Sequence, residues 1–239
     1  MKRDYTEACS RFIEAVIELS NELKKVSGDY SLPDWTSKFL LPEEDTQRKE
    51  IQDRETQFNN ELLEISKLKN NLANIERYKL LLSGSGRALE VQVAMVLREI
   101  GFEVDDPLEG RDDLILKYKD KIAVTEIKGV NKSAAEKHAA QLEKWVSEYL
   151  TKNSIKPKGI LIVNAYNNIS LDMRTEPPFP DQMLQYSINR EHCLITTIQL
   201  LGILYYLRQN PGDRDNLINE LFYTIGKYTK FLDYKQFLV

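Results

Sequence analysis

Hydrophobic residues near the start of the chain recur at helical spacing. Between residues 5 and 26 they fall three or four positions apart, with charged residues between them: Phe12, Val16, Leu19, Leu23 and Val26. This spacing predicts an amphipathic helix. Gly28, Pro33 and Pro42 follow, so we expect a short linker before the next helix.

A heptad pattern extends over residues 43–82, which contain neither proline nor glycine. With Ile51 at position a, seven of the ten a and d positions are apolar: Ile51, Phe58, Ile65, Leu68, Leu72, Ile75 and Leu82. The exceptions are Arg54, Glu61 and Lys79. Such a pattern is typical of a coiled coil, and we expect residues 43–83 to form a homodimer or higher oligomer. The alternative is a long helix that lies along its own domain.

Ser83-Gly84-Ser85-Gly86 ends this helix, and the pattern then alternates between helices and strands. Helices are expected over 87–100, 132–151, 196–208 and 213–230, and strands over 102–104, 114–118, 121–128, 159–163 and 192–197. Their order predicts an α/β domain with a mixed sheet. We therefore divide the chain into an N-terminal helix and linker (1–42), a coiled-coil helix (43–83) and an α/β domain with C-terminal helices (84–239).

Charged residues gather at one end of the hairpin formed by the second and third strands. Asp112 and Asp113 directly precede an apolar strand, and alternation puts Glu126 and Lys128 on one face of its partner. A tight turn at 119–120 brings Asp113 close to them. Two neighbouring carboxylates repel each other unless a cation joins them, and hard oxygen ligands select Mg²⁺, with Mn²⁺ as the alternative. The competing interpretation is a surface salt-bridge trio, which would contribute less than about 1 kcal/mol.

Asp113 followed by Glu126-Ile127-Lys128 resembles the motif of the PD-(D/E)XK nuclease superfamily, which has the restriction-endonuclease-like fold. The resemblance covers roughly residues 84–200, where the order of elements is similar to the αβββαβ core of that family. Gly86-Arg87-Ala88-Leu89-Glu90 resembles the start of its first core helix, whose glutamate faces the metal site. Gln141 resembles the additional glutamine of Mrr-type restriction endonucleases.

The resemblance implies a metal-dependent endodeoxyribonuclease. Asp113, Glu126 and Glu90 would bind Mg²⁺, Lys128 would act on the attacking water, and Gln141 would support the site. The chain departs from the family pattern because Asp112 stands where proline is usual; Asp113 is the preferred ligand because it adjoins the apolar strand. The family further implies DNA as substrate, defence against foreign DNA as context, and a partner protein of a defence system.

A second E-x-K sequence, the two histidines and the net charge each restrict which residues and functions are expected. Glu22-Leu23-Lys24 also spells E-x-K, but on an amphipathic helix, so it is expected to be structural. His138 on the polar side of a helix and His192 before a strand are expected to be surface or packing residues. A net charge of −4 argues against a protein that coats nucleic acid non-specifically, but not against an enzyme with a local site.

The remaining composition bears on location and on the competing functions. Two distant cysteines and the lack of a long apolar run predict a cytoplasmic protein without a membrane segment. One alternative function is a catalytically weak or inactive nuclease-fold module that binds DNA or a partner and assembles through the coiled coil. The other is a coiled-coil scaffold with a structural α/β cap.

Overall fold

The computed structural model describes residues 2–26, 32–105 and 114–238. The chain divides into two units, Met1–Lys67 and Leu68–Val239. The first unit contains helix α1 (Lys2–Val26), a 3-10 turn (Asp34–Lys38) and the beginning of helix α2 (Pro42–Glu76). Pro42 is favourable at the start of α2 because the first backbone N–H groups of a helix have no partner within it.

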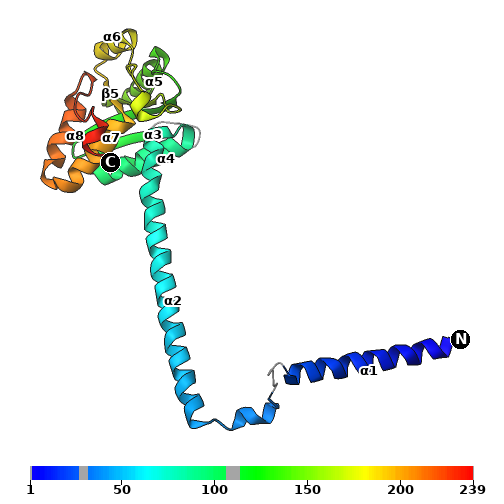
Figure 1. Cartoon of the computed structure of the whole chain (residues 1–239). Coiled ribbons are helices and arrows are strands. Elements are labelled where there is room, and N and C mark those ends of the chain that lie inside the picture. The colour runs from blue at the N-terminus through cyan, green and yellow to red at the C-terminus, as the bar shows by residue number, and fades with distance from the viewer. Residues whose placement is uncertain (1, 27–31, 106–113, 239) are drawn as a thin grey trace. The chain divides into compact units, whose positions relative to one another are not determined.

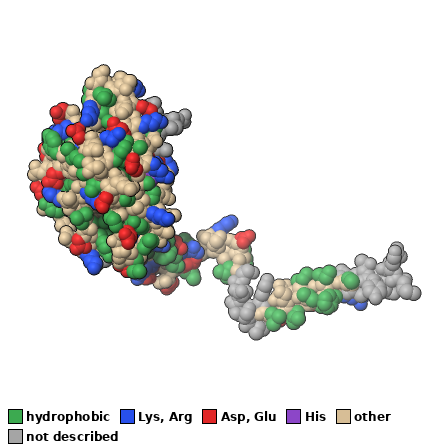
Figure 2. All heavy atoms as spheres, turned by 90° about the horizontal axis from the view of Figure 1, so that it is seen from above, with side chains coloured by type: hydrophobic (Ala, Val, Ile, Leu, Met, Phe, Trp, Pro, Cys, Tyr) green, Lys and Arg blue, Asp and Glu red, His purple; other side chains and the backbone are tan. Residues whose placement is uncertain are grey.

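The helices of the first unit leave their apolar side chains uncovered. Hydrophobic side chains gather along α1 (Figure 2), where they include Phe12 (71% exposed), Ile13, Val16, Ile17, Leu19 and Leu23. No residue of α2 is buried, and its apolar heptad positions are exposed, from Ile65 at 47% to Leu68 at 67%. The long helix expected from the heptad pattern is thus confirmed, with its apolar stripe open to solvent.

A six-stranded mixed sheet forms the second unit, in the order β1-β2-β3-β4-β5-β6. The strands are β1 (Glu103–Asp105), β2 (Leu114–Tyr118), β3 (Lys121–Val130), β4 (Lys158–Ala165), β5 (Cys193–Thr196) and β6 (Gly226–Lys227). The first three pair antiparallel, and β3 to β6 pair parallel. The last described pair between β2 and β3 is Leu114 with Thr125, whereas β3 continues to Val130 beside β4. The expected α/β class with a mixed sheet is confirmed.

Helices cover both faces of this sheet (Figure 1). Helices α4 (Gly86–Ile100), α7 (Thr197–Gln209) and α8 (Arg214–Tyr223) supply one buried cluster, together with Ile127 and Ile162 of the sheet. Helices α5 (Glu136–Asn153) and α6 (Asp181–Asn189) supply the other, with Leu161 and Val163. Because neighbouring residues of β3 and β4 face opposite sides, each strand contributes to both layers.

The C-terminal end of one predicted helix is confirmed and that of another is wrong. Gly101 closes α4 as expected: its φ is 123°, and its N–H contacts the carbonyl oxygens of Leu97 and Arg98. The helix predicted over 213–230 is wrong in length, because α8 ends at Tyr223 and Thr224 is extended. Gly226, with φ of 83°, then starts strand β6, which pairs with β5.

The carboxyl end of the long helical segment is fastened to the sheet through its backbone. The last carbonyl groups of a helix have no partner within it. A 3-10 turn (Arg77–Lys79) and α3 (Leu80–Ser83) follow α2, and their final carbonyls accept side-chain hydrogen bonds: Leu81 from Thr197 Oγ1 (2.5 Å), Leu82 from Arg174 Nη2 (2.6 Å) and Gly84 from Asn164 Nδ2 (2.9 Å). The side chains of Arg174 and Asn164 are therefore engaged in holding this helix end.

A glycine on β3 makes the joint possible. A Cβ atom at Gly129 would lie 2.5 Å from the carbonyl oxygen of Gly84 and 2.6 Å from the Cα atom of Ser85. The segment between α3 and α4 can therefore lie directly against the strand that carries Glu126 and Lys128.

Among the described residues, no single helix is both long and apolar enough to cross a membrane. The segments Pro42–Ser83 and Gly86–Ile100 satisfy that test together, but they are bent by 117° at the break between them.

Candidate functional site

Strand β3 directs two of the predicted site residues to the same face of the sheet. Glu126 and Lys128 alternate with Ile127, which lies in the cluster of α4 and α7. The two charged residues consequently face the layer of α5, which packs on β3 and β4. The side-by-side arrangement of Glu126 and Lys128 that alternation predicts is confirmed.

The carboxylate of Glu126 is held in a fixed position although it is almost completely buried. Its side chain is 1% exposed, whereas that of Lys128 is 30% exposed. Nε1 of Trp145, on α5, donates a hydrogen bond to Oε2 of Glu126 over 2.9 Å. Nζ of Lys128 lies 2.7 Å from Oε1, at ion-pair distance but without the alignment of a hydrogen bond. A buried carboxylate is stable only when it is paired, and this one is paired on both oxygens.

The chemistry of this carboxylate fits a divalent cation. Oε1 of Glu126 is buried, accepts no hydrogen bond from the described residues and has the ammonium of Lys128 at ion-pair distance, so a cation already lies at this oxygen. Carboxylate oxygen is the donor that Mg²⁺ prefers. In the described part of the chain, no three His, Cys, Asp or Glu side chains form a ready metal-binding group. The predicted ligand Asp113 lies outside the described residues; β2 begins at its neighbour Leu114, opposite Thr125.

The other predicted carboxylate, Glu90, lies in the first turns of α4. It is buried to 9% exposure, and its Oε2 lies 3.5 Å from Nη1 of Arg87, one turn earlier. No described contact joins Glu90 to Glu126. The structure therefore shows that Glu90 is a buried, charge-paired residue, and its role as a metal ligand stays a prediction.

Helix α5 carries Gln141 and Trp145 four residues apart, hence on the same side of the helix. Gln141 is half-buried. Nζ of Lys144 lies 4.7 Å from the centre of the Trp145 ring, so a cation covers the indole that holds Glu126. Trp145 is not among the site residues predicted from the sequence. Its position four residues after Gln141 is the signal that would have revealed it.

His138 differs from its sequence-based expectation. It is buried rather than on a polar surface, because its Nδ1 accepts the backbone N–H of Ala135 (3.1 Å) and closes the first turn of α5. Burial lowers the pKa of His138 below its usual value, and the positive charges of Lys137 and Lys128 lower it further. A neutral imidazole therefore lies within electrostatic reach of Lys128.

His192 is a packing residue at the opposite end of the parallel strands. It is fully buried just before β5, and a Cβ atom at Gly159, at the start of β4, would contact its ring. Its Nε2 lies 2.9 Å from Oε2 of Glu143, while Nδ1 has no partner among the described residues. Burial lowers the pKa of His192, against the opposing effect of Glu143.

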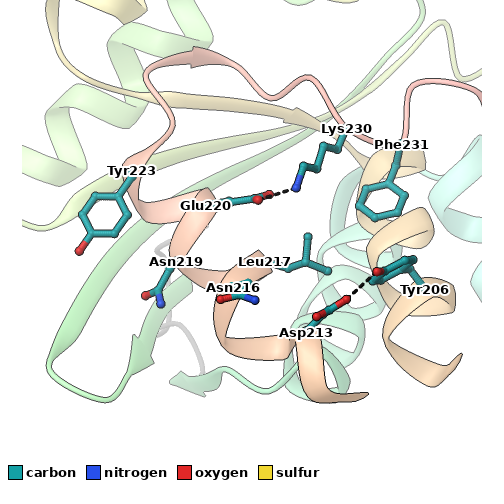
Figure 3. A pocket seen from close by; sticks show the side chains of 9 residues that line it. All are labelled: Tyr206, Asp213, Asn216, Leu217, Asn219, Glu220, Tyr223, Lys230 and Phe231. Atoms are coloured by element: carbon teal, nitrogen blue, oxygen red, sulfur yellow. Dashed lines mark hydrogen bonds and ion pairs between the residues drawn. The ribbon is translucent and has the colours of Figure 1, made fainter. Parts of the chain in front are cut away.

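Two surface cavities differ in their position and in how their polar side chains are engaged. The cavity in Figure 3, of about 550 Å³, is lined by polar and apolar residues of α7, the turn before α8, α8 itself and the C-terminal segment. Four of its polar side chains form two pairs, Glu220 with Lys230 (2.5 Å) and Tyr206 with Asp213 (2.6 Å), which leaves fewer of them for a substrate. A second cavity, of about 310 Å³, lies at the carboxyl ends of β4, β5 and β6. Its lining includes Val163, the β4 partner of Lys128. The carboxyl ends of parallel strands are the usual location of α/β sites.

Comparison of the chain with protein-family models, with curated proteins and with solved structures found no match.

Proposed function

We propose that the second unit is a Mg²⁺-dependent nuclease that hydrolyses phosphodiester bonds of DNA. The observation that supports this proposal best is the buried carboxylate of Glu126, which has an ion-paired lysine on one oxygen and an indole on the other. A structural salt bridge on a hairpin would be solvent-exposed, whereas this one is enclosed where β3 continues beyond the described part of β2.

Each residue has a role in this proposal. Glu126 holds the cation through Oε1, with Asp113 and Glu90 as the further ligands and Gln141 as a supporting residue. Mg²⁺, or Mn²⁺ in its place, would polarise the phosphoryl group and lower the pKa of a bound water. Lys128, 30% exposed, orients that water and offsets negative charge on the phosphate.

The order α4-β1-β2-β3-α5-β4 supports a restriction-endonuclease-like core. On that basis we propose defence against foreign DNA, together with a partner protein of the same system, as the biological context. Cys9 and Cys193 are both free thiols, which is compatible with a reducing cytoplasm.

Plasmid cleavage by the purified full-length chain tests the proposed reaction. With Mg²⁺ the wild-type protein should nick or cut supercoiled DNA, and EDTA should prevent this. Asp113→Ala and Lys128→Ala should each abolish cleavage at a temperature where the circular dichroism spectrum shows that the variant is folded; Lys128→Ala should also lower stability, because it leaves a buried carboxylate oxygen unpaired. The matched control is Glu22→Gln/Lys24→Met, which alters the other E-x-K sequence and should leave cleavage intact. Cleavage that survives both site substitutions would refute the assignment.

The alternative function is a nuclease fold without efficient catalysis. Because the described residues contain no complete group of three ligands, the unit is also compatible with a nuclease fold that binds DNA, or a partner, and cleaves weakly or not at all. DNA affinity without metal-dependent cleavage would support this alternative.

We also propose that the chain associates with further copies of itself. The exposed apolar positions of α2 support a homodimer, or a higher oligomer, that forms through residues 43–83.

A further inference from the structure

We infer that α2 pairs with a second copy of itself in an antiparallel orientation, with the two-fold axis near residue 63. This inference rests on the proposed self-association, and it goes beyond it by assigning orientation and register. The surface concerned is the heptad stripe, which we call the α2 seam and define by its a and d positions from Ile51 to Ile75. These side chains are exposed in the single chain, so they are open to a partner.

A parallel, in-register dimer would bring like charges together. In that arrangement each a or d residue meets its own copy, so Arg54 would face Arg54, and Glu61 would face Glu61, inside the seam. The flanking e and g positions add a further repulsion, because Glu50 would face Glu55 of the other copy. One attractive flanking pair, Glu64 with Lys69, partly offsets these repulsions.

An antiparallel dimer centred near residue 63 avoids these clashes in the seam. There each a residue meets a d residue of the other copy, which pairs Ile51 with Ile75 and Phe58 with Leu68, each pair occurring twice. Arg54 then faces an apolar side chain, Leu72, instead of another arginine. No charged a or d residue of the α2 seam meets a like charge.

The flanking positions select this register over its neighbours. At the e positions Glu55 meets Lys69 and Arg48 meets Glu76, each twice, and Leu62 meets Leu62 on the axis. One repulsion remains, between the two copies of Glu64. A shift by one heptad in one direction would place Arg48 opposite Lys69, and in the other direction Glu55 opposite Glu76. Charge complementarity therefore favours a second copy of α2 as the partner of the α2 seam, in the register that places Ile51 opposite Ile75.

The Glu55–Lys69 pair carries most of this selectivity. Arg48 and Glu76 already form ion pairs within their own chain, with Glu44 and Lys79 respectively. Their ion pair with the other copy therefore adds less to the stability of the dimer. Glu55 and Lys69 are exposed on the helix surface, on the same flank of the α2 seam. Exchanging the charges of Glu55 and Lys69 tests the antiparallel pairing, and exchanging those of Glu64 and Lys69 tests the parallel one.

Sedimentation equilibrium of full-length variants measures the effect. Lys69→Glu turns two attractive pairs into repulsive ones and should weaken dimerisation about tenfold. Glu55→Lys/Lys69→Glu should restore the affinity, whereas Glu64→Lys/Lys69→Glu should not. Lys67→Glu, the same charge change on the outward side of α2, is the matched control and should have no effect. A parallel dimer would also recover in Glu55→Lys/Lys69→Glu, because the lysine introduced at position 55 would then face Glu50, so the Glu64 variant decides the orientation. Restoration by Glu64→Lys/Lys69→Glu would show a parallel dimer and overturn the inference.

Disulfide trapping gives an independent measurement. In a Cys9→Ser background, oxidation of a mixture of Phe58→Cys and Leu68→Cys chains should link residue 58 to residue 68, and neither variant should link to itself. Links of 58 to 58 and of 68 to 68 would again indicate a parallel dimer. A wild-type chain that stays monomeric at a concentration on the order of 100 µM, where a dissociation constant of about 1 µM would give almost complete dimer, would refute self-association altogether. That failure would leave the plasmid-cleavage test untouched, so the two proposals fail separately.

Discussion

The indole of Trp145 donates its N–H to Oε2 of Glu126, a residue 19 positions earlier on β3. A helix of one layer thereby fixes the carboxylate of a strand, with its second oxygen directed at Lys128. Groups that orient a metal-binding side chain usually affect function as strongly as the ligand does. Trp145 is therefore a positioning residue in the proposed site.

Replacement of Trp145 by Phe should show how much this hydrogen bond contributes to stability. The ring volume is largely kept, but a buried carboxylate oxygen loses its donor, which should lower the free energy of unfolding by about 1–3 kcal/mol. Urea denaturation measures this loss. In a Glu126→Leu background the same substitution should cost much less, since no carboxylate remains to be satisfied. An equal cost in both backgrounds would show that Trp145 contributes by packing alone.

Mg²⁺ should stabilise the folded chain through Glu126. A ligand that binds only the folded state raises the free energy of unfolding by about 2.7 kcal/mol at a hundred times its Kd. We expect a rise in melting temperature with Mg²⁺ that disappears in Glu126→Gln and persists in the control Glu22→Gln. An unchanged melting temperature in wild-type protein at millimolar Mg²⁺ would count against a metal at this site, whatever the nuclease assay shows.

Substitution by alanine should be costly at one glycine and nearly neutral at another. Gly129→Ala would force a Cβ atom against the backbone of Gly84 and Ser85, so it should destabilise the second unit by about 1–3 kcal/mol. Gly212→Ala introduces a Cβ atom that meets nothing within 4 Å and should change stability by less than about 0.5 kcal/mol. Chemical denaturation of both variants provides the comparison, and equal losses would contradict the close approach at Gly129.

Acid should weaken the fold through its two histidines. Burial lowers the pKa of His192, which lies near Glu143, Lys158 and Arg190, and it also lowers the pKa of His138. Below the usual histidine pKa of about 6.5, the unfolded chain binds protons that the folded chain does not, so the free energy of unfolding falls with falling pH. The contribution is fully present above that pKa and is lost as the pH drops through the lowered values.

Unfolding free energies at pH 7.5 and 5.5 check this sign. The decrease between the two values should be smaller in His192→Asn/His138→Asn than in wild-type protein, because these are the two histidines of the chain. A decrease of the same size in both proteins would assign the acid sensitivity to carboxylates.

The elements of the second unit were largely predictable because their signals are local. The apolar run over 159–163 indicates a buried strand, and Gly101 indicates a helix end, from neighbouring residues alone. Alternation along β3 likewise placed Glu126 and Lys128 together. The helix expected up to residue 230 failed because α8 ends at Tyr223 and Gly226 and Lys227 pair with β5, which is a tertiary contact.

Contacts between layers were not predictable in the same way. The hydrogen bond from Trp145 depends on how α5 crosses β3, and periodicity identifies only the inward side of a helix. The burial of His138 was missed because its ring satisfies the helix end itself and so needs no polar surroundings. Asp113, the key residue of the motif, lies outside the described residues, and its role rests on the resemblance.

The ion pair between Lys128 and Glu126 has a consequence for assembly. A buried carboxylate normally needs a cation before its surroundings can fold around it, but here the chain supplies one by covalent attachment. The ammonium group serves as a built-in counter-ion, which cannot diffuse away at low magnesium. In the proposed nuclease, folding would not depend on the supply of metal, and Mg²⁺ would have to displace the ammonium group of Lys128 from Oε1.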